Sequence, residues 1–284
     1  MKSSRPKSSE EQTEADVKKP RLMNTIIAAF AGGVAGGYAS FIFEGMKKRL
    51  QSNQTLPNPL NMTTYKWLRE SFRGANAFTC SLVPTGIFQQ VTKHVLEEKG
   101  IAHTPMGETI GNVAAGAVGG VASAGVENVI LWQQLGKSGP YEAIQRLFSE
   151  SPTAIFRGIF PVMAREAMFG VCYLKLAGEA GKYAKENFGN RYELPAQIVV
   201  GTIGSLASHP FDTTATTMQK YKFTFSQAVT HLWEEGGLGS FYKGCAARVF
   251  LFTTAMMVIS QTSEKVLSRL TDKTDATEAP SFKR

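Results

Sequence analysis

Six stretches of the chain are apolar over roughly the length of a membrane-spanning helix, and polar segments separate them. A hydrocarbon core about 30 Å thick needs about 20 helical residues to cross it. The fifth stretch is the weakest by hydropathy. The stretches run near residues 24–43, 75–96, 109–132, 155–177, 195–214 and 244–267. This pattern predicts an all-α membrane protein with six transmembrane helices.

The connections between these stretches alternate between long and short. Each long connection carries the pattern of a short amphipathic helix, as where Tyr141, Ile144 and Leu147 line one face. The long connections contain more Lys and Arg than Asp and Glu, whereas the short ones, 97–108 and 178–194, are neutral or slightly acidic. Basic residues favour the untranslocated side, so we expect both termini on the side opposite the long connections.

Composition excludes several classes of function. The 284 residues include 31 Lys and Arg against 23 Asp and Glu, a net charge of +8. Cys80, Cys172 and Cys245 lie far apart, which disfavours a disulfide framework or a zinc site, and the four histidines are equally scattered. No phosphate-binding loop, nucleophile motif or calcium loop is present. We therefore expect no enzyme activity, cofactor, metal or nucleic-acid partner.

Three ten-residue segments share one pattern, with an acid third and a glutamine tenth. These segments, called the signature segments below, are residues 42–51, 125–134 and 210–219. Their acids, Glu44, Glu127 and Asp212, lie 83 and 85 residues apart. Proline and glycine loosen a helix, so kinks are expected at Pro210 and at Gly125.

A second marker recurs at the same period, an aromatic residue followed by a basic residue and a glycine. It reads Phe72-Arg73-Gly74, Phe156-Arg157-Gly158 and Tyr242-Lys243-Gly244. Two independent markers at one period predict three structural repeats. We assign the repeats to residues 23–100, 101–190 and 191–271, with disordered tails at 1–22 and 272–284.

The tripled pattern resembles the mitochondrial carrier family, whose signature is Pro-x-[Asp/Glu]-x-x-[Lys/Arg]-x-[Lys/Arg]-x-Gln. The resemblance covers roughly residues 24–270, and the third segment keeps Pro210, Asp212 and Gln219. It implies six transmembrane helices in three pseudo-threefold repeats, each with a short amphipathic matrix helix. It also implies a multi-pass protein of the mitochondrial inner membrane with both termini in the intermembrane space.

In the family, the signature residues pair between repeats and close the matrix side. The resemblance assigns this gate to Glu44, Lys47, Gln51, Glu127, Gln134, Asp212 and Gln219. The basic residue is lost at Ile130 and Ala215, so at most one of the three signature pairs is expected, with two acids uncompensated. Three interpretations are open. The gate holds the matrix side closed only weakly, or its acids attract a cationic group, or Arg49 and other loop cations neutralise the acids.

The family's substrate contacts lie seven residues after each glycine of the second marker, at Ser81, Arg165 and Leu251. Arg165 interrupts an apolar stretch at mid-membrane depth, where a charge is a functional hypothesis by default. Its guanidinium is suited to grip a carboxylate or phosphate. A structural pair with Glu166 is the alternative, and Arg248, one turn before Leu251, is a further candidate.

Two substrate classes follow from these residues. The dipeptide Arg165-Glu166 resembles the amino-acid branch of the family, whereas the net charge and a positive cavity favour an anion. We rank an adenine nucleotide, ATP or ADP, first, with exchange as the mode of transport. The chain also resembles nucleotide carriers that bacteria secrete into host mitochondria. A carrier-shaped scaffold that no longer transports is the remaining alternative.

The second marker also resembles the family's cardiolipin sites, where backbone amides at a helix N-terminus bind anions. This assigns lipid contacts to Arg73, Gly74, Arg157, Gly158, Lys243 and Gly244. The family's second ionic network, on the cytoplasmic side, is nearly absent, because only Glu264 fits its pattern. The expected partners are a small-molecule metabolite and membrane lipid, and the expected state is a monomer.

Overall fold

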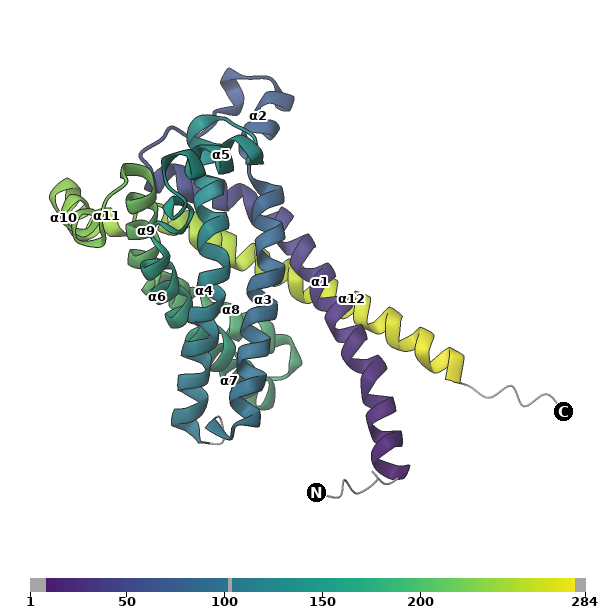
Figure 1. Cartoon of the computed structure of the whole chain (residues 1–284). Helices are drawn as coiled ribbons and strands as arrows, with labels where there is room; N and C mark the ends of the chain where they lie inside the picture. The colour runs from purple at the N-terminus through teal and green to yellow at the C-terminus, as the bar shows by residue number, and fades with distance from the viewer. Residues whose placement is uncertain (1–8, 102–103, 279–284) are drawn as a thin grey trace.

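The computed structural model describes residues 9–101 and 104–278, and in that part every regular element is helical (Figure 1). Six helical segments cover the six apolar stretches. They are α1 (Ser9–Gln51), α3 (Ala75–Glu98), α4 (Pro105–Gly136), α6 (Ile159–Gly170) with a π-helical turn (Val171–Leu176) and α7 (Ala177–Phe188), α8 (Glu193–Ala207) with α9 (His209–Tyr221), and α12 (Cys245–Glu278).

The three long connections carry the short helices predicted from their amphipathic pattern. These are α2 (Thr64–Ser71), α5 (Pro140–Glu150) and α10 (Phe225–Gly236), the last followed by the single turn α11 (Leu238–Phe241). Each buries a small apolar or polar face, Ala143 and Leu147 in α5 and Ala228 and Leu232 in α10. Thr63 and Thr224 cap the first turns of α2 and α10 with their hydroxyl oxygens.

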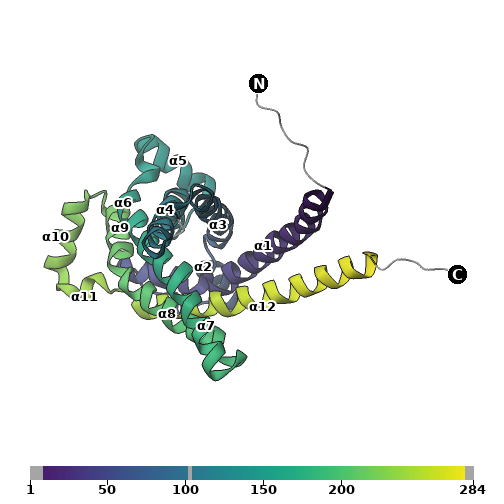
Figure 2. The ribbon, with the colours of Figure 1, turned by 90° about the horizontal axis from the view of Figure 1, so that it is seen from below.

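The long segments close into a ring. α1 packs against α3, α3 against α4, and α4 against α6. α6 and α7 pack against α9 and α8, α8 packs against α12, and α12 returns to α1. In both ribbon views α1 and α12 lie side by side, and their outer ends extend beyond the rest of the bundle (Figures 1 and 2).

Within the described residues, two helical segments are long and apolar enough to cross a membrane, Pro105–Gly136 and Leu238–Leu270. The apolar window of the first is mostly buried in the protein, whereas only a small part of the second is buried. The all-helical fold agrees with the predicted class. The assignment of all six segments as membrane spans stays a prediction.

The glycines of the second marker occupy equivalent positions in the three repeats. Gly74, Gly158 and Gly244 all have positive φ, at +98°, +83° and +81°, where a side chain is strained. A Cβ on these glycines would meet Ile130, Ala215 and Lys47, respectively. These three residues hold the sixth position of a signature segment, each in the next repeat around the ring. The repeats therefore contact one another cyclically through the same two positions.

The fourth position of each signature segment also has one kind of contact. Thr213 donates a hydrogen bond to the Phe241 carbonyl at 2.8 Å, and Asn128 donates to the Ile155 carbonyl at 3.3 Å. In the first repeat a Cβ on Gly45 would lie 3.2 Å from the Ser71 carbonyl oxygen. The Phe241, Ile155 and Ser71 carbonyls each stand two residues before the basic residue of the second marker, so the repeat includes this backbone contact. Asn128 also donates a shorter bond, 2.8 Å, to the neighbouring Ala154 carbonyl.

One of the two expected kinks is present. The third repeat breaks between α8 and α9 at Ser208, and Pro210 lies in the first turn of α9. Proline cannot donate the backbone hydrogen bond that a continuous helix needs there. At Gly125 the helix α4 has no break, and α1 likewise continues through Ile42, so a kink at Gly125 stays a prediction. Glycine keeps its N–H donor, so it permits a bend without requiring one.

The ends of the chain differ from the sequence prediction. α1 begins at Ser9 and α12 continues to Glu278, so much of both segments expected to be disordered is helical. Neither segment contains glycine, and both are rich in residues that tolerate a helix. Residues 1–8 and 279–284 lie outside the described residues.

The strained glycine of the third repeat offers a test of the cyclic contact. We expect Gly244→Ala to lower the free energy of unfolding by about 1–3 kcal/mol, because φ is positive there. The new methyl would also lie 3.1 Å from the Lys47 carbonyl oxygen. Thermal unfolding in detergent measures the change. Gly239→Ala is the control, since a Cβ there meets nothing within 4 Å; equal melting of both variants would contradict the contact.

Candidate functional site

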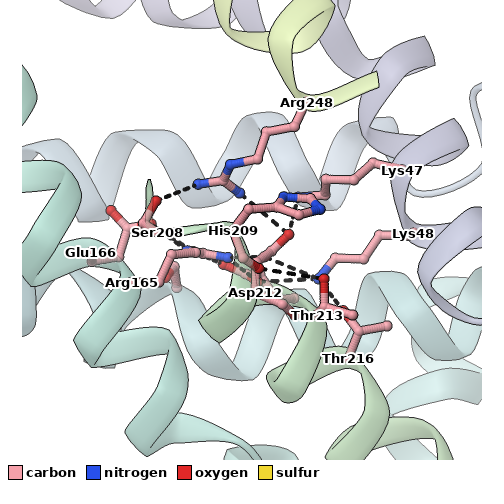
Figure 3. A network of polar contacts seen from close by, with 12 residues as sticks. Lys47, Lys48, Arg165, Glu166, Ser208, His209, Asp212, Thr213, Thr216 and Arg248 are labelled. Carbon is pink, nitrogen blue, oxygen red and sulfur yellow. Dashed lines mark hydrogen bonds and ion pairs between the residues drawn. The ribbon is translucent and has the colours of Figure 1, made fainter. Parts of the chain in front are cut away.

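Eight charged side chains meet where the signature segments lie. Figure 3 shows six of them, including Asp212, as labelled sticks. This gate cluster, as we call it, comprises four cations and four acids, and each side chain is at most 15% exposed. They are Lys47 and Lys48 of α1, Arg165 and Glu166 of α6, Arg248 of α12, Glu44 of α1, Glu127 of α4 and Asp212 of α9. By formal charge the cluster is neutral, so each buried charge has an opposite charge to compensate it.

Asp212 is the centre of the gate cluster. Its carboxylate lies 3.0 Å from Lys47 Nζ, 2.6 Å from Arg165 Nη1 and 3.3 Å from Arg248 Nη1. Gln51 Nε2 donates a further hydrogen bond to it at 2.8 Å. The carboxylate of α9 is thus bound by α1, α6 and α12, which belong to three different repeats.

Arg165 binds three carboxylates at once. Its two terminal nitrogens clasp Glu127, with Nη1 at 2.9 Å from Oε2. Nη1 also reaches Asp212, and Glu166 accepts from Nε at 3.0 Å and from Nη2 at 2.6 Å. The predicted structural pair with Glu166 is therefore present, and two further acids join it. The side chain is buried inside the helical bundle.

Lys48 is the functional residue that the sequence analysis missed. It is fully buried, and its Nζ lies 3.4 Å from Glu127, 3.9 Å from Asp212 and 3.1 Å from the Thr216 hydroxyl. Thr216 in turn donates to the Gln51 side chain at 3.0 Å. The available signal was a second lysine directly after Lys47, at a position that the signature leaves open.

The expectation of two uncompensated acids was therefore wrong. Glu127 is bound by Lys48 and Arg165, and Glu44 pairs with Lys47 at 2.7 Å. The cations are Lys47 at the basic signature position of α1, Lys48 directly after it, and Arg165 of α6; none of them comes from a loop. Arg49 points to α2 instead, where its guanidinium donates to the Glu70 carbonyl at 3.2 Å.

The other assigned residues lie outside the gate cluster. Gln219 donates to the Arg157 carbonyl at 3.3 Å, and Gln134 is buried beside Gly45. Ser81 donates to the Phe78 carbonyl of its own helix at 2.7 Å, and Leu251 is half-buried on α12. The structure thus brings together Glu44, Lys47, Gln51, Glu127, Arg165, Glu166, Asp212 and Arg248 of the predicted site.

The basic residues of the second marker pair with acids of their own repeat. Arg73 lies 2.6 Å from Glu70 and Lys243 lies 2.6 Å from Glu235, and Arg157 pairs with Glu150. The hydrogen bond from Arg157 lowers the pKa of Glu150, and the bond from Lys243 does the same for Glu235. These pairs form a second, outer set of ionic contacts around the gate cluster.

The opposite end of the ring has fewer described ionic contacts. Lys175 of the π-helical turn lies 3.5 Å from Glu108 and donates to the Pro105 carbonyl at 3.1 Å. Glu264 accepts a hydrogen bond from Ser260 of its own helix at 3.2 Å. The described ion pairs are thus concentrated at the signature end of the ring.

Comparison with known proteins adds two findings. The family model described as mitochondrial carrier protein matches residues 192–274, which contain the third repeat. A curated relative, mitochondrial glycine transporter B of Danio rerio, is 25% identical over 130 residues, which cover 43% of this chain and 45% of the relative. The match thus spans somewhat less than half the length of that relative. Together with the signature that recurs in all three repeats, these matches support membership of the mitochondrial carrier family.

Proposed function

We propose that the protein is a solute transporter of the mitochondrial inner membrane that works by alternating access. The gate cluster carries this proposal, because it joins all three repeats at one end of the helical ring with buried charge pairs. In secondary transporters, repeats move against one another around a site near the bilayer midplane. On this account the six long segments span the membrane, and both termini lie in the intermembrane space.

Opening the gate must separate charges that are buried in pairs, which is costly without compensation. A substrate that binds the same groups supplies that compensation, since a ligand shifts an equilibrium by its differential affinity for the two states. Arg165 is suited to this role. Its guanidinium holds acids of α4 and α9, and an incoming carboxylate competes for the same nitrogens.

The charge balance of the gate cluster favours a small zwitterionic amino acid over the adenine nucleotide ranked first from the sequence. A zwitterion brings one carboxylate for Arg165 and one ammonium group for Glu166 or Glu127, so the cluster stays neutral. A nucleotide brings several negative charges, but each of the four cations already binds a carboxylate. The name of the Danio rerio relative, a glycine transporter, supports the same class.

A competition assay in proteoliposomes tests both classes together. We expect uptake of labelled glycine to be inhibited by unlabelled small neutral amino acids and to be unaffected by ADP or ATP. Liposomes without protein give the background. If only nucleotides inhibit the uptake, an adenine nucleotide would be the favoured substrate instead. Absence of flux with every compound would support the non-transporting scaffold.

We also propose that anionic lipid, cardiolipin in this membrane, binds where α3, α6 and α12 begin. Arg73 Nε and Arg157 Nη1 are buried without a hydrogen-bond partner among the described residues, so they have donors to offer. The backbone amides after Gly74, Gly158 and Gly244 add the partial positive charge of a helix N-terminus. The ring is complete within one chain, which supports a monomer.

A further inference from the structure

Arg248 holds both sides of the break between α8 and α9. Its Nε donates to the carbonyl and the hydroxyl of Ser205 at 3.0 and 2.8 Å, on the α8 side. Its Nη2 donates to the Ser208 hydroxyl at 3.3 Å, at the break itself. Its Nη1 lies 3.3 Å from Asp212, on the α9 side. One buried guanidinium therefore spans the whole interruption.

The break leaves backbone groups that need new partners. In a continuous helix the Ser205 carbonyl would accept from the amide four residues later, and Pro210 has no amide to offer to Leu206. Here the Ser205 carbonyl accepts a charge-assisted bond from Arg248 and a second bond from the Ser208 hydroxyl at 3.1 Å, and Arg248 also donates to that hydroxyl. A buried carbonyl without a partner is costly, so the guanidinium stabilises the bent backbone.

In the other two repeats, where the corresponding helix is unbroken, the position of Arg248 holds an apolar residue. The residue four after the marker glycine is Phe78 in the first repeat and Val162 in the second. Phe78 packs against Phe41 with ring centroids 5.6 Å apart, and Val162 belongs to a buried apolar cluster with Ala124. Both face an unbroken helix, α1 or α4. The repeat that is broken is the one with arginine there.

We propose that Arg248 is a positioning residue, which fixes the bend between α8 and α9 and so places the Asp212 carboxylate among the cations of the gate. That Arg248 fixes the bend is inferred from the geometry alone. Its effect on transport rests on the proposed function. Lysine cannot replace the arginine, because a single ammonium group cannot reach Ser205, Ser208 and Asp212 together in this fork geometry.

The arrangement also assigns Arg248 a distinct place in the transport cycle. Lys47, Lys48 and Arg165 belong to the first two repeats, so they separate from Asp212 when the gate opens. Arg248 belongs to the same repeat as Asp212, so it moves with the carboxylate and stays bound to it. The bend is then the same in both states, and Asp212 returns to its place when the gate closes.

Hydrogen exchange of the full-length protein tests the structural part. We expect the amides of residues 205–213 to exchange about tenfold faster in Arg248→Lys than in the wild-type protein. Ser205→Ala, which removes one of the bonds, should give a smaller increase in the same segment. Arg269→Lys, an exposed substitution on the same helix, is the control and should change nothing. Wild-type exchange in both Arg248→Lys and Ser205→Ala would overturn the proposal.

Transport kinetics separate positioning from substrate contact. Arg248→Lys should lower the maximal rate of glycine uptake and increase leakage of preloaded solute, with KM unchanged. A raised KM with an unchanged maximal rate would make Arg248 a substrate contact and would overturn the proposal. If the wild-type protein moves no solute at all, the proposed function fails, while the exchange measurement still decides whether Arg248 fixes the bend.

Discussion

Replacing Lys48 by glutamine should lower the free energy of unfolding by about 3–5 kcal/mol, the cost of leaving a buried charge without its partner. Lys48 is fully buried and lies between Glu127 and Asp212. Glutamine retains a donor for the Thr216 hydroxyl but removes the positive charge. The gate cluster then carries four acids and three cations, so one negative charge is uncompensated in the bundle.

Thermal unfolding in detergent measures this loss. Lys66→Gln is the matched control, because Lys66 is an exposed lysine on α2 and a single surface charge contributes little. We expect a clearly lower unfolding midpoint for Lys48→Gln than for the control. Equal midpoints would show that Lys48 does not compensate the acids of α4 and α9.

Arg165→Gln should have an effect as large, and it should also abolish transport. The substitution leaves Glu127 without its two-pronged partner and removes one of the cations around Asp212. Glu127→Gln in the same chain removes the acid that is left unpaired. The double variant should therefore be more stable than the sum of the two single changes predicts, by about 2 kcal/mol.

A double-mutant cycle on a second pair controls this measurement. Arg157 and Glu150 form an ion pair at the outer edge of the same end of the ring, with side chains 18% and 24% exposed. This pair is more exposed than Arg165 and Glu127, and ion pairs nearer the solvent couple more weakly, so the cycle of Arg157→Gln and Glu150→Gln should give the smaller value. A larger coupling energy for the outer pair would contradict a gate that depends on Arg165.

The sequence predicted the features that repeat. The acid and glutamine spacing and the recurring glycine located the three units, and the cyclic packing of Gly74, Gly158 and Gly244 follows the same period. The acids and Arg165 were also expected at the functional site, since charge within an apolar stretch needs a partner or water. These features were predictable because each depends on a residue type at a fixed position in the sequence.

The pairing within the gate cluster was not predictable in the same way. Lys48 follows the signature position, and the rotation of α1 within the ring decides which lysine reaches Glu127. The sequence made Arg248 a candidate substrate contact. In the structure its partners are instead the backbone and side chains around the break between α8 and α9. Such contacts depend on how helices are turned and bent, which a pattern along one chain does not record.

The most direct test of the central claim, that Arg165 at the gate cluster controls passage of solute, is glycine uptake by proteoliposomes that contain equal amounts of folded wild-type or Arg165→Lys protein. Lysine keeps the positive charge but cannot clasp Glu127 and reach Asp212 together. We predict saturable uptake by the wild-type protein and background uptake by the variant. Wild-type uptake no faster than that of empty liposomes, or full uptake by Arg165→Lys, would contradict the account.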